Sequence, residues 1–243
     1  MDAAYAEGYE RLYHEHWWWR SRETILLGEI RRLGLASPLR ILDVGCGNGL
    51  FFPKLSELGE VWGIEADTSV LHEDGPYRDR IFTELLGAPI YQDRRFDLIT
   101  ALDVIEHIED DTAAVRDMAG MLAPGGVLLL TVPAFMLLWD EHDVINQHHR
   151  RYTRESLRRV LERHGEILSL RYMFHAIFFP KLLVKWLNRS RDRKIAQHNI
   201  PSPLVNKVME GVNAAEFRLG RGLPIPFGTS VCGVLRRPST ASD

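Results

Sequence analysis

The 243-residue chain has little cysteine, no long apolar run and little net charge. Its two cysteines, Cys46 and Cys232, are too few for a disulfide framework and show no CxxC spacing, so we expect a reducing, cytoplasmic environment. The N-terminus has no charged leader followed by an apolar core. The longest apolar run, Val127 to Trp139, is too short to span a bilayer and contains Pro133. We therefore expect a soluble protein, at most peripheral to a membrane.

The formal net charge is −3, and both signs are mixed along the chain. The basic clusters, Arg31 to Arg32 and Arg189 to Lys194, are interpreted as solvated faces and not as a nucleic-acid footprint. The length is sufficient for a complete α/β core. We expect one catalytic domain with an insertion and no nucleic-acid partner, and the oligomeric state stays open.

A glycine-rich turn separates an apolar run from a helical pattern between Arg40 and Phe52, where the sequence reads RILDVGCGNGLFF. Residues Arg40 to Val44 suit a buried strand, and Leu50 to Leu58 predict a helix. The glycines let the backbone turn tightly and approach a ligand that a Cβ atom would exclude. The next apolar run, Val61 to Ile64, ends in Glu65, whose carboxylate can accept hydrogen bonds from both hydroxyls of a ribose. The GxGxG spacing, in place of GxGxxG, favours a nucleoside cofactor without bridging phosphates.

This pairing of a glycine turn with a later acid resembles the first two motifs of the class I S-adenosylmethionine-dependent methyltransferases. Phe96 to Ala101 resembles the family's fourth strand, and Leu102 to Ile108 resembles the loop beneath the methionine end of the cofactor. Met121 to Val132 resembles the helix end, Pro-Gly-Gly turn and fifth strand. The resemblance implies S-adenosyl-L-methionine as cofactor and S-adenosyl-L-homocysteine as product. The cofactor-binding residues that we expect are Asp43, Gly45, Cys46, Gly47, Asn48, Gly49, Glu65, Ala66, Thr83, Asp103 and Arg22.

Strand and helix patterns alternate through this region, which predicts a parallel sheet with helices on both faces. The expected fold class is α/β, with a doubly wound, mostly parallel seven-stranded sheet of the Rossmann-like methyltransferase type. A third strand is expected near Ile81 to Thr83, a sixth at Ile167 to Met173, and a seventh at Ser230 to Arg236 that the family places antiparallel beside the sixth. The expected units are an N-terminal helical lid (1–37), a cofactor-binding core (38–173), a helical insertion (174–228) and the last strand with a tail (229–243).

Two polar segments follow the fourth and fifth strands and are candidates to face the methyl acceptor. Asp103, Glu106 and His107 follow the fourth strand, with helix capping as the alternative role. The segment Trp139 to Tyr152, reading WDEHDVINQHHRRY, is dense in histidine, aspartate and arginine for a connection, and a helix is expected to open at Thr153. Imidazole titrates near neutral pH and guanidinium binds phosphate or carboxylate. The candidate bases are His107, His148 and His149, and the candidate acceptor-binding residues are Glu106, Asp143, Arg150, Arg151 and Tyr152.

Two other interpretations of the second segment stay open. A metal site would use His142, Asp143, His148 and His149, although no HExxH spacing is present. A structural role would pair Arg150 and Arg151 with Asp140 and Glu141. The expected cofactor set contains no metal.

The N-terminal segment places aromatic residues on one helical face, since Tyr5, Tyr9 and Tyr13 recur every four residues. Such a face can close over a nucleoside, and Arg20 or Arg22 can meet the methionine carboxylate. In the alternative interpretation, the aromatic residues only cover the edge of the sheet.

The insertion contains two predicted helices. The first runs from Pro180 to Leu187 with Lys181 and Lys185 as a narrow polar stripe, and the second begins after the N-cap Ser202. The second helix shows an apolar face made of Leu204, Val208, Val212, Ala215 and Leu219. The two helices either pack on each other over the acceptor pocket, or form a peripheral membrane contact through 174–194 or a pocket for a lipid-linked acceptor.

The sequence thus predicts an S-adenosylmethionine-dependent methyltransferase that acts on O or N of a small-molecule or lipid-linked acceptor. One alternative is a methyltransferase-like module that binds the cofactor without turnover. The other is an NAD-dependent dehydrogenase, which the glycine spacing and the Pro-Gly-Gly turn disfavour.

Overall fold

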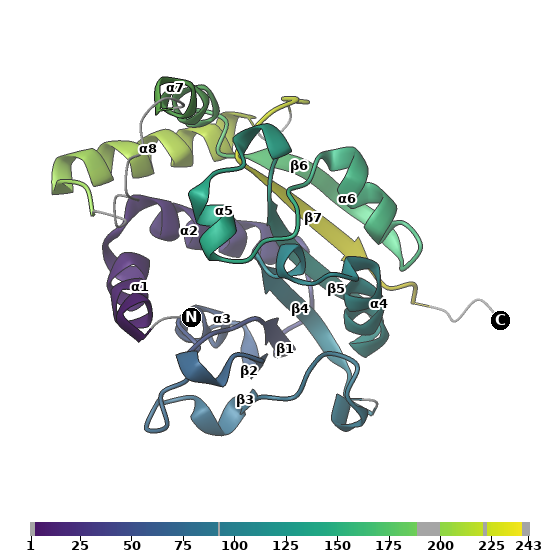
Figure 1. Cartoon of the computed structure of the whole chain (residues 1–243). Coiled ribbons are helices and arrows are strands. Elements are labelled where there is room, and N and C mark those ends of the chain that lie inside the picture. The colour runs from purple at the N-terminus through teal and green to yellow at the C-terminus, as the bar shows by residue number, and fades with distance from the viewer. Residues whose placement is uncertain (1–2, 92, 189–199, 221–222, 240–243) are drawn as a thin grey trace.

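A single seven-stranded sheet organises the chain (Figure 1). The computed structural model describes residues 3–91, 93–188, 200–220 and 223–239. The strand order is β3-β2-β1-β4-β5-β7-β6, and β7 runs antiparallel to both of its neighbours. The strands are β1 (Leu39–Val44), β2 (Gly59–Ile64), β3 (Ile81–Phe82), β4 (Phe96–Leu102), β5 (Leu122–Pro133), β6 (Glu166–Met173) and β7 (Ser230–Arg236). The predicted fold class, including the antiparallel last strand, is confirmed.

Helices cover both faces of this sheet. Buried side chains of α2 and α3 pack on one face, and those of α4 and α6 pack on the other. The helices are α1 (Ala3–Glu15), α2 (Trp17–Arg32), α3 (Phe52–Leu55), α4 (Asp111–Met121), α5 (Glu141–Ile145), α6 (Arg154–Leu161), α7 (Phe178–Asn188) and α8 (Pro203–Leu219). In Figure 1, α2 and α8 lie to the left of the sheet and α4 and α6 to the right.

The strand register brings three predicted site segments together. Val44, at the end of β1, lies level with Ile64 of β2 and Ala101 of β4. The glycine turn, Glu65 and the loop after β4 therefore emerge at one edge of the sheet. Ligands of open α/β sheets bind at this edge, beyond the carboxyl ends of the strands.

The helix after the glycine turn is shorter than predicted. It covers Phe52–Leu55, whereas the pattern predicted Leu50 to Leu58. The difference arises because β2 begins at Gly59, so the chain must already turn back toward the sheet. The Leu58 carbonyl accepts a hydrogen bond from the Leu39 amide at 3.0 Å and is no longer available to a helix.

The start of α6 matches its sequence signal. The Thr153 side chain accepts a hydrogen bond from the Ser156 amide, and the Ser156 hydroxyl accepts one from the Thr153 amide. This reciprocal capping satisfies amide groups that the first helical turn leaves free.

The insertion departs from the prediction in its packing. Leu204, Val208 and Leu219 of α8 are exposed, so the predicted apolar face does not form a buried face. The helix packs on α2 through a different side, where Asn206 and Asn213 are buried. The Asn206 side chain accepts a hydrogen bond from the Trp17 amide at 2.9 Å and donates one to the Glu15 carbonyl at 3.1 Å. These bonds satisfy backbone groups at the junction of α1 and α2, which favours polar residues at this interface. The basic run Arg189 to Lys194 lies outside the described residues.

Candidate functional site

The glycine turn leaves open space beside one of its three predicted glycines. Gly45, Gly47 and Gly49 all have positive φ angles, of 68°, 54° and 77°. A Cβ atom added at Gly45 would lie 2.6 Å from a methyl group of Val104, and one at Gly49 would lie 3.2 Å from Tyr77. At Gly47, no heavy atom among the described residues lies within 4 Å of that position. The backbone at Gly47 can therefore approach a ligand that occupies this space.

Glu65 lies directly across from the glycine turn. One carboxylate oxygen accepts the Gly47 amide at 2.9 Å, and the other accepts the Asp67 amide at 2.9 Å. A carboxylate can accept about four hydrogen bonds, so capacity remains for the two hydroxyls of a ribose. This geometry fits the nucleoside part of the predicted cofactor.

Asp43 is buried beneath the same loop, and its carboxylate accepts the Thr100 hydroxyl at 2.6 Å. Burial raises the pKa of Asp43 to about 7, while the Thr100 hydrogen bond and the Arg22 charge lower it. Asp43 therefore titrates in the physiological range.

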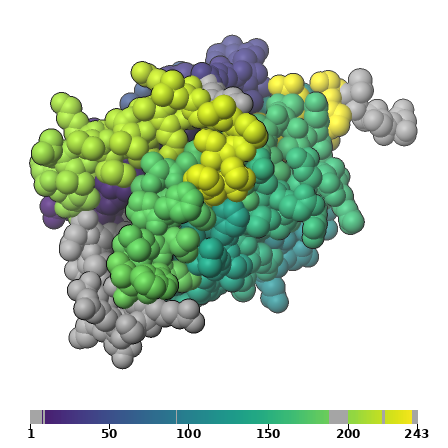
Figure 2. All heavy atoms as spheres, turned by 90° about the horizontal axis from the view of Figure 1, so that it is seen from above, coloured from purple at the N-terminus to yellow at the C-terminus, as the bar shows by residue number. Residues whose placement is uncertain are grey.

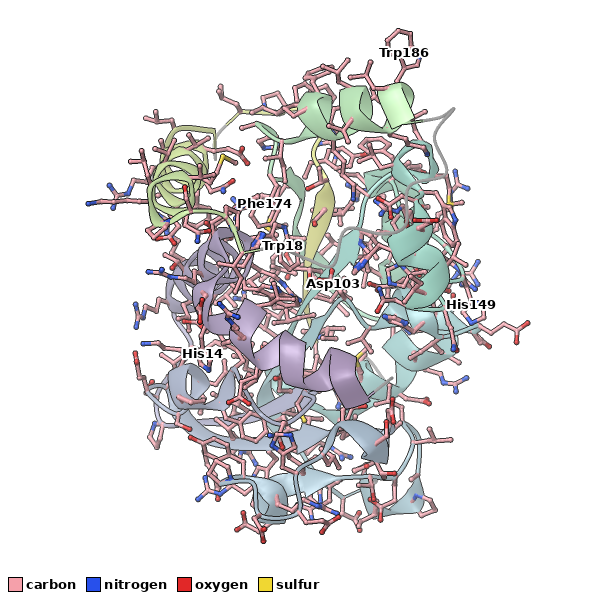
Figure 3. All side chains as sticks on the ribbon, turned by 60° about the vertical axis from the view of Figure 1, so that its left-hand side comes forward. His14, Trp18, Asp103, His149, Phe174 and Trp186 are labelled. Atoms are coloured by element: carbon pink, nitrogen blue, oxygen red, sulfur yellow. The ribbon has the colours of Figure 1, made fainter. Side chains whose placement is uncertain are left out.

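Arg22 joins α2 to the loop after β4. Its guanidinium lies 3.0 Å from the Asp103 carboxylate and 5.1 Å and 5.2 Å from the ring centroids of Trp18 and Trp19. Asp103 has a φ of 57°, and its carboxylate also accepts the Thr131 hydroxyl at 3.1 Å. Both predicted cofactor-binding residues are thus brought together, and Figure 3 shows Asp103 near the centre of the molecule.

The other predicted cofactor-binding residues have various surroundings. Asn48 exchanges hydrogen bonds with His72, from its amide nitrogen to Nδ1 at 2.8 Å and from the His72 amide to its oxygen at 3.1 Å. Cys46 is buried, and burial raises the pKa of its thiol. Ala66 is exposed, and the Thr83 amide donates to the Glu84 carboxylate at 3.2 Å.

The N-terminal helix lies close to this region. α1 packs against the short helix η1 (Thr68–Val70), which follows Glu65. The Tyr13 hydroxyl donates to Glu23 at 2.6 Å, and burial together with this carboxylate raises the pKa of Tyr13. The side chains of Tyr5 and Tyr9 lie outside the described residues. The lid role of this segment stays a prediction.

A buried ion pair holds the second polar segment. The Arg151 guanidinium donates from Nε and Nη2 to the two oxygens of Asp143, both at 2.8 Å, and the Asp140 amide donates to Asp143 at 2.8 Å. Burial raises the pKa of Asp143, but hydrogen bonds from His148 and Arg151 outweigh it and hold that pKa well below its usual range. Asp143 is therefore an ionised, buried carboxylate.

Arg150 and Tyr152 share a different partner. The Arg150 guanidinium lies 2.9 Å from the Asp111 carboxylate, and the Tyr152 hydroxyl donates to the same group at 2.7 Å. The structural alternative predicted Asp140 and Glu141 as partners of the two arginines, whereas the observed partners are Asp111 and Asp143. Asp111 begins α4, about 40 residues earlier in the chain, and no local pattern links it to the arginines.

Three candidate side chains lie together between the loops after β4 and β5. Ligand atoms of Glu106, His107 and His148 all lie within 4.8 Å of one another. Glu106 is fully buried, and neither carboxylate oxygen has a hydrogen-bond partner among the described residues. Burial and the Asp103 charge raise the pKa of Glu106 well above its usual range. This trio differs from the predicted metal quartet, which shares only His148 with it.

His149 has a different position from His148. Its side chain is exposed, and its amide donates to the Glu106 carbonyl at 2.8 Å. Figure 3 shows His149 at the periphery of the molecule, away from Asp103. The His148 ring instead lies perpendicular to the His107 ring, with centroids 4.6 Å apart. Of the two neighbouring histidines, His148 is thus the one grouped with Glu106.

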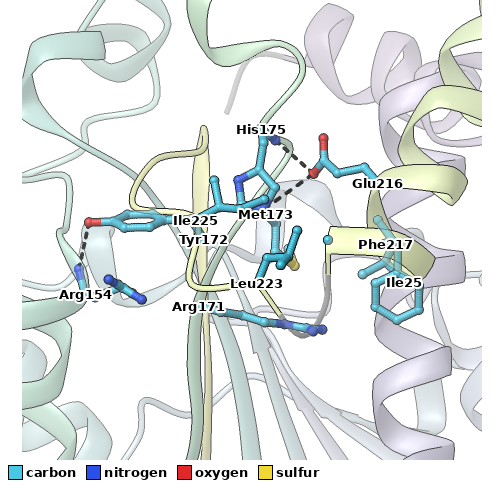
Figure 4. A pocket seen from close by; sticks show the side chains of 11 residues that line it. Ile25, Arg154, Arg171, Tyr172, Met173, His175, Glu216, Phe217, Leu223 and Ile225 are labelled. Carbon is cyan, nitrogen blue, oxygen red and sulfur yellow. Dashed lines mark hydrogen bonds and ion pairs between the residues drawn. The ribbon is translucent and has the colours of Figure 1, made fainter.

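A separate pocket lies beside β6 (Figure 4). Tyr172 lines it, and its hydroxyl accepts the Arg154 amide at 3.2 Å, while the Glu216 carboxylate accepts the His175 amide at 2.8 Å. None of the predicted site residues lines this pocket.

Comparison with known proteins agrees with this arrangement. A family model described as a methyltransferase domain matches residues 18–166, more than half of the chain. The ubiquinone biosynthesis O-methyltransferase of Bradyrhizobium diazoefficiens is 32% identical over 108 residues, which cover 42% of this chain and 43% of that protein. The chain thus matches less than half of the length of this curated relative.

Two solved structures share the fold. A putative sarcosine dimethylglycine methyltransferase from Galdieria sulphuraria has a TM-score of 0.57 and 18% identity, covering 90% of this chain and 85% of that one. The [4+2]-cyclase SpnF has a TM-score of 0.56 and 20% identity, covering 90% and 82%.

The chain belongs to the methyltransferase-domain family. This membership confirms the resemblance to class I S-adenosylmethionine-dependent methyltransferases. Within the part of the chain that the structure describes, every helix is too short or too polar to cross a lipid bilayer.

Proposed function

We propose that this protein transfers the methyl group of S-adenosylmethionine to an oxygen or nitrogen of a small-molecule acceptor. The observation that carries the proposal is the open space at Gly47, bounded by Glu65, at the edge of the sheet where Asp103 also lies. When bound, the cofactor supplies a methyl group on a positively charged sulfur. The residues of the chain bind the cofactor, orient the acceptor and exclude water.

Each part of the edge has a distinct role in this proposal. Glu65 holds the ribose, and the Gly47 backbone lies against the cofactor. Arg22 and Asp103 hold the methionine end. The acceptor lies beyond Asp103, beside the loop that contains His148. Fixing the acceptor in line with the methyl group accounts for a large share of the rate, because orientation removes much of the entropic cost of a bimolecular step.

Two other functions are separable by experiment. A module that binds the cofactor without methyl transfer is one, and the similarity in fold to a [4+2]-cyclase illustrates that this fold alone does not specify the reaction. The other is an NAD-dependent dehydrogenase, against which the family membership argues.

The proposal is tested first by cofactor binding and then by turnover. Isothermal titration should show binding of S-adenosylhomocysteine and none of NAD. Incubation with methyl-labelled S-adenosylmethionine and a panel of phenols, carboxylates and amines should then label at least one acceptor. A chain that binds S-adenosylhomocysteine but labels no acceptor would favour the module, and a chain that binds only NAD would favour the dehydrogenase.

A lipid-linked acceptor at a membrane surface is a further part of the proposal, and α7 supports it. Both of its lysines are directed inward: Lys181 lies 3.3 Å from the Asp140 carboxylate, and the Lys185 ammonium donates to the carbonyls of Leu137 and Trp139 at 2.7 Å and 2.6 Å. Its exposed large apolar residues are Phe179, Leu183, Val184, Trp186 and Leu187.

This surface is large and lies beside the candidate acceptor loop. Trp186 is 69% exposed and points away from the molecule in Figure 3. Figure 2 shows α7 in green and α8 in yellow-green on one face. The short helix η5 (Met136–Leu138) contacts α7 and adds the exposed side chains of Met136 and Leu137 to this surface. Contiguous exposed apolar surface of this kind marks binding sites for membranes or proteins.

The charge distribution favours an anionic membrane over a neutral one. Apart from the two inward lysines of α7, residues 174–228 contain seven basic residues and only three acidic ones. Basic residues beside an apolar helical face attract anionic lipid headgroups.

Vesicle sedimentation tests this part. We expect the protein to sediment with vesicles that contain phosphatidylglycerol and far less with pure phosphatidylcholine vesicles. Trp186→Ser should lower the bound fraction at least fivefold, whereas Leu85→Ser, at a similarly exposed position (71%) outside the insertion, should not. Equal effects of the two substitutions, or no sedimentation of the parent protein, would contradict the membrane contact.

A further inference from the structure

We infer that Asp143 is a positioning residue that fixes the tautomer and orientation of His148, so that His148 Nε2 takes the proton of the methyl acceptor. This inference rests on the proposed function and names the base within the same site. Three histidines were candidates from the sequence, and the geometry separates them.

The hydrogen bond to Asp143 determines which ring nitrogen carries the proton. His148 Nδ1 lies 2.8 Å from Asp143 Oδ1. Three other donor groups hold the same carboxylate, two from the Arg151 guanidinium and one from the Asp140 amide. An ionised carboxylate can only accept, so His148 Nδ1 must donate and the lone pair of the neutral ring lies on Nε2.

The orienting group cannot move easily. Asp143 is fully buried, and the bidentate pair with Arg151 is also buried. Arg151 donates further from Nη1 to the Ala134 carbonyl at 3.2 Å, which ties the pair to the end of β5. The His148 side chain is itself only 8% exposed. The imidazole is therefore held in one orientation before the acceptor arrives.

The charged and titratable groups that face His148 come from its own segment and from the loop after β4. From its own segment come Asp143, Arg151 and His142, whose ring centroid lies 6.3 Å from that of His148. From η4 (Ile105–His107), after β4, come Glu106 and His107. Partial burial of the His107 ring and repulsion from His148 lower the pKa of His107.

His149 and His107 lack this arrangement. The His149 amide donates to the Glu106 carbonyl in the loop after β4, while the His149 side chain is exposed to solvent. The Glu106 carboxylate beside His107 has no hydrogen-bond partner among the described residues, and His107 is hydrogen-bonded to the Asn146 backbone instead. Only His148 of these three has a buried carboxylate that fixes one nitrogen and leaves the other available.

The proton transfer balances with methyl transfer. As the acceptor oxygen or nitrogen forms its bond to the methyl carbon, the carbon–sulfur bond breaks and its electron pair stays on sulfur. His148 Nε2 takes the acceptor proton, and the imidazolium so formed is stabilised by Asp143. Solvent then removes this proton and restores the neutral ring.

Nuclear magnetic resonance of the full chain with labelled histidine, in the presence of S-adenosylhomocysteine, tests the tautomer without an acceptor. We expect His148 to be protonated at Nδ1 in the parent protein. Asp143→Asn should change the tautomer population of His148, because the ionised carboxylate that accepts the Nδ1 proton is lost. Glu155→Gln, an exposed substitution on α6, should leave that population unchanged. A parent His148 protonated at Nε2, or an unchanged tautomer population in Asp143→Asn, would overturn the inference.

Turnover with an acceptor found in the panel provides the second readout. Asp143→Asn should lower kcat about 100-fold or more and shift the acidic limb of the pH profile, with S-adenosylhomocysteine affinity within a factor of two. If Asp143→Asn does not fold, His148→Ala replaces it, and added imidazole should restore turnover at least tenfold. Unchanged turnover in His148→Ala would overturn the role as base. A tight Zn²⁺ site that titration finds in the parent protein and not in His148→Ala would also overturn this role. If the parent protein does not bind S-adenosylhomocysteine, the proposed function is contradicted instead.

Discussion

Substitution of Gly47 by valine should abolish cofactor binding while the protein still folds. Gly47 and Gly45 both have positive φ, yet their surroundings differ. No heavy atom of the described residues lies within 4 Å of a Cβ added at Gly47, whereas Val104 lies 2.6 Å from one added at Gly45. A side chain at Gly47 therefore meets the ligand, and a side chain at Gly45 meets the protein.

The expected cost at Gly47 follows from this difference. A residue with a Cβ atom in the left-handed region loses about 1–2 kcal/mol of stability. For a chain of this size, that loss lowers the Tm by roughly 2–8 °C. Gly45→Ala has the same backbone cost and adds overlap with Val104, so it should be the less stable of the two variants despite its smaller side chain.

Thermal unfolding with and without S-adenosylhomocysteine measures both effects. At 100 times its Kd, the ligand should stabilise the parent protein by about 2.7 kcal/mol. Gly47→Val should unfold cooperatively and lose this ligand shift, and Gly47→Ala should lose part of it. A ligand shift in Gly47→Val equal to that of the parent would refute the placement of the cofactor beside this glycine.

Two further predictions concern the carboxylates near the glycine turn. Glu65→Ala should weaken S-adenosylhomocysteine binding by about 1.5–3 kcal/mol, the range for hydrogen bonds to a charged group, and unchanged affinity by titration calorimetry in the folded variant would exclude a ribose contact. Asp43 has a folded-state pKa of about 7, above the usual 3.8, so its ionisation costs stability in the folded state. The contribution of Asp43 to the free energy of unfolding should therefore be fully favourable below about pH 4 and be lost as the pH rises toward 7. The loss is at most about 1.4 kcal/mol per unit of difference between the folded and unfolded pKa. Urea unfolding of Asp43→Asn across this range should show a weaker pH dependence, and an identical dependence would show that other groups cause it.

Local patterns predicted the strands and the glycine turn after β1 well. Ser230–Arg236 forms β7 as expected, because a buried strand needs a continuous run of apolar and small residues and the neighbouring turns limit its length. Glu65 was found from its position after a strand, since the end of a parallel strand fixes which edge of the sheet its next residue occupies.

The partners of the buried charges could not be predicted in this way. Arg150 binds Asp111 across 39 positions, and Arg22 binds Asp103 across 81 positions. Such pairs depend on how helices and loops pack, and no periodic pattern in the sequence predicts that packing. The buried side of α8 could not be predicted for the same reason. Asn206 satisfies backbone groups of the α1–α2 junction, and these bonds select the side of the helix that is buried.

The distribution of buried charge indicates that function, more than stability, has selected this edge of the sheet. Seven buried side chains of the described residues carry a carboxyl or guanidinium group: Arg22, Glu29, Asp43, Glu106, Asp111, Asp143 and Arg151. All but Glu29 lie at the carboxyl ends of the strands or contact the loops that follow them. Replacement of buried ion pairs by apolar residues is often neutral or stabilising, so a chain under selection for stability alone has no need to gather them here. Their concentration is expected if the edge must hold a charged cofactor at one end and stabilise a proton in transit at the other.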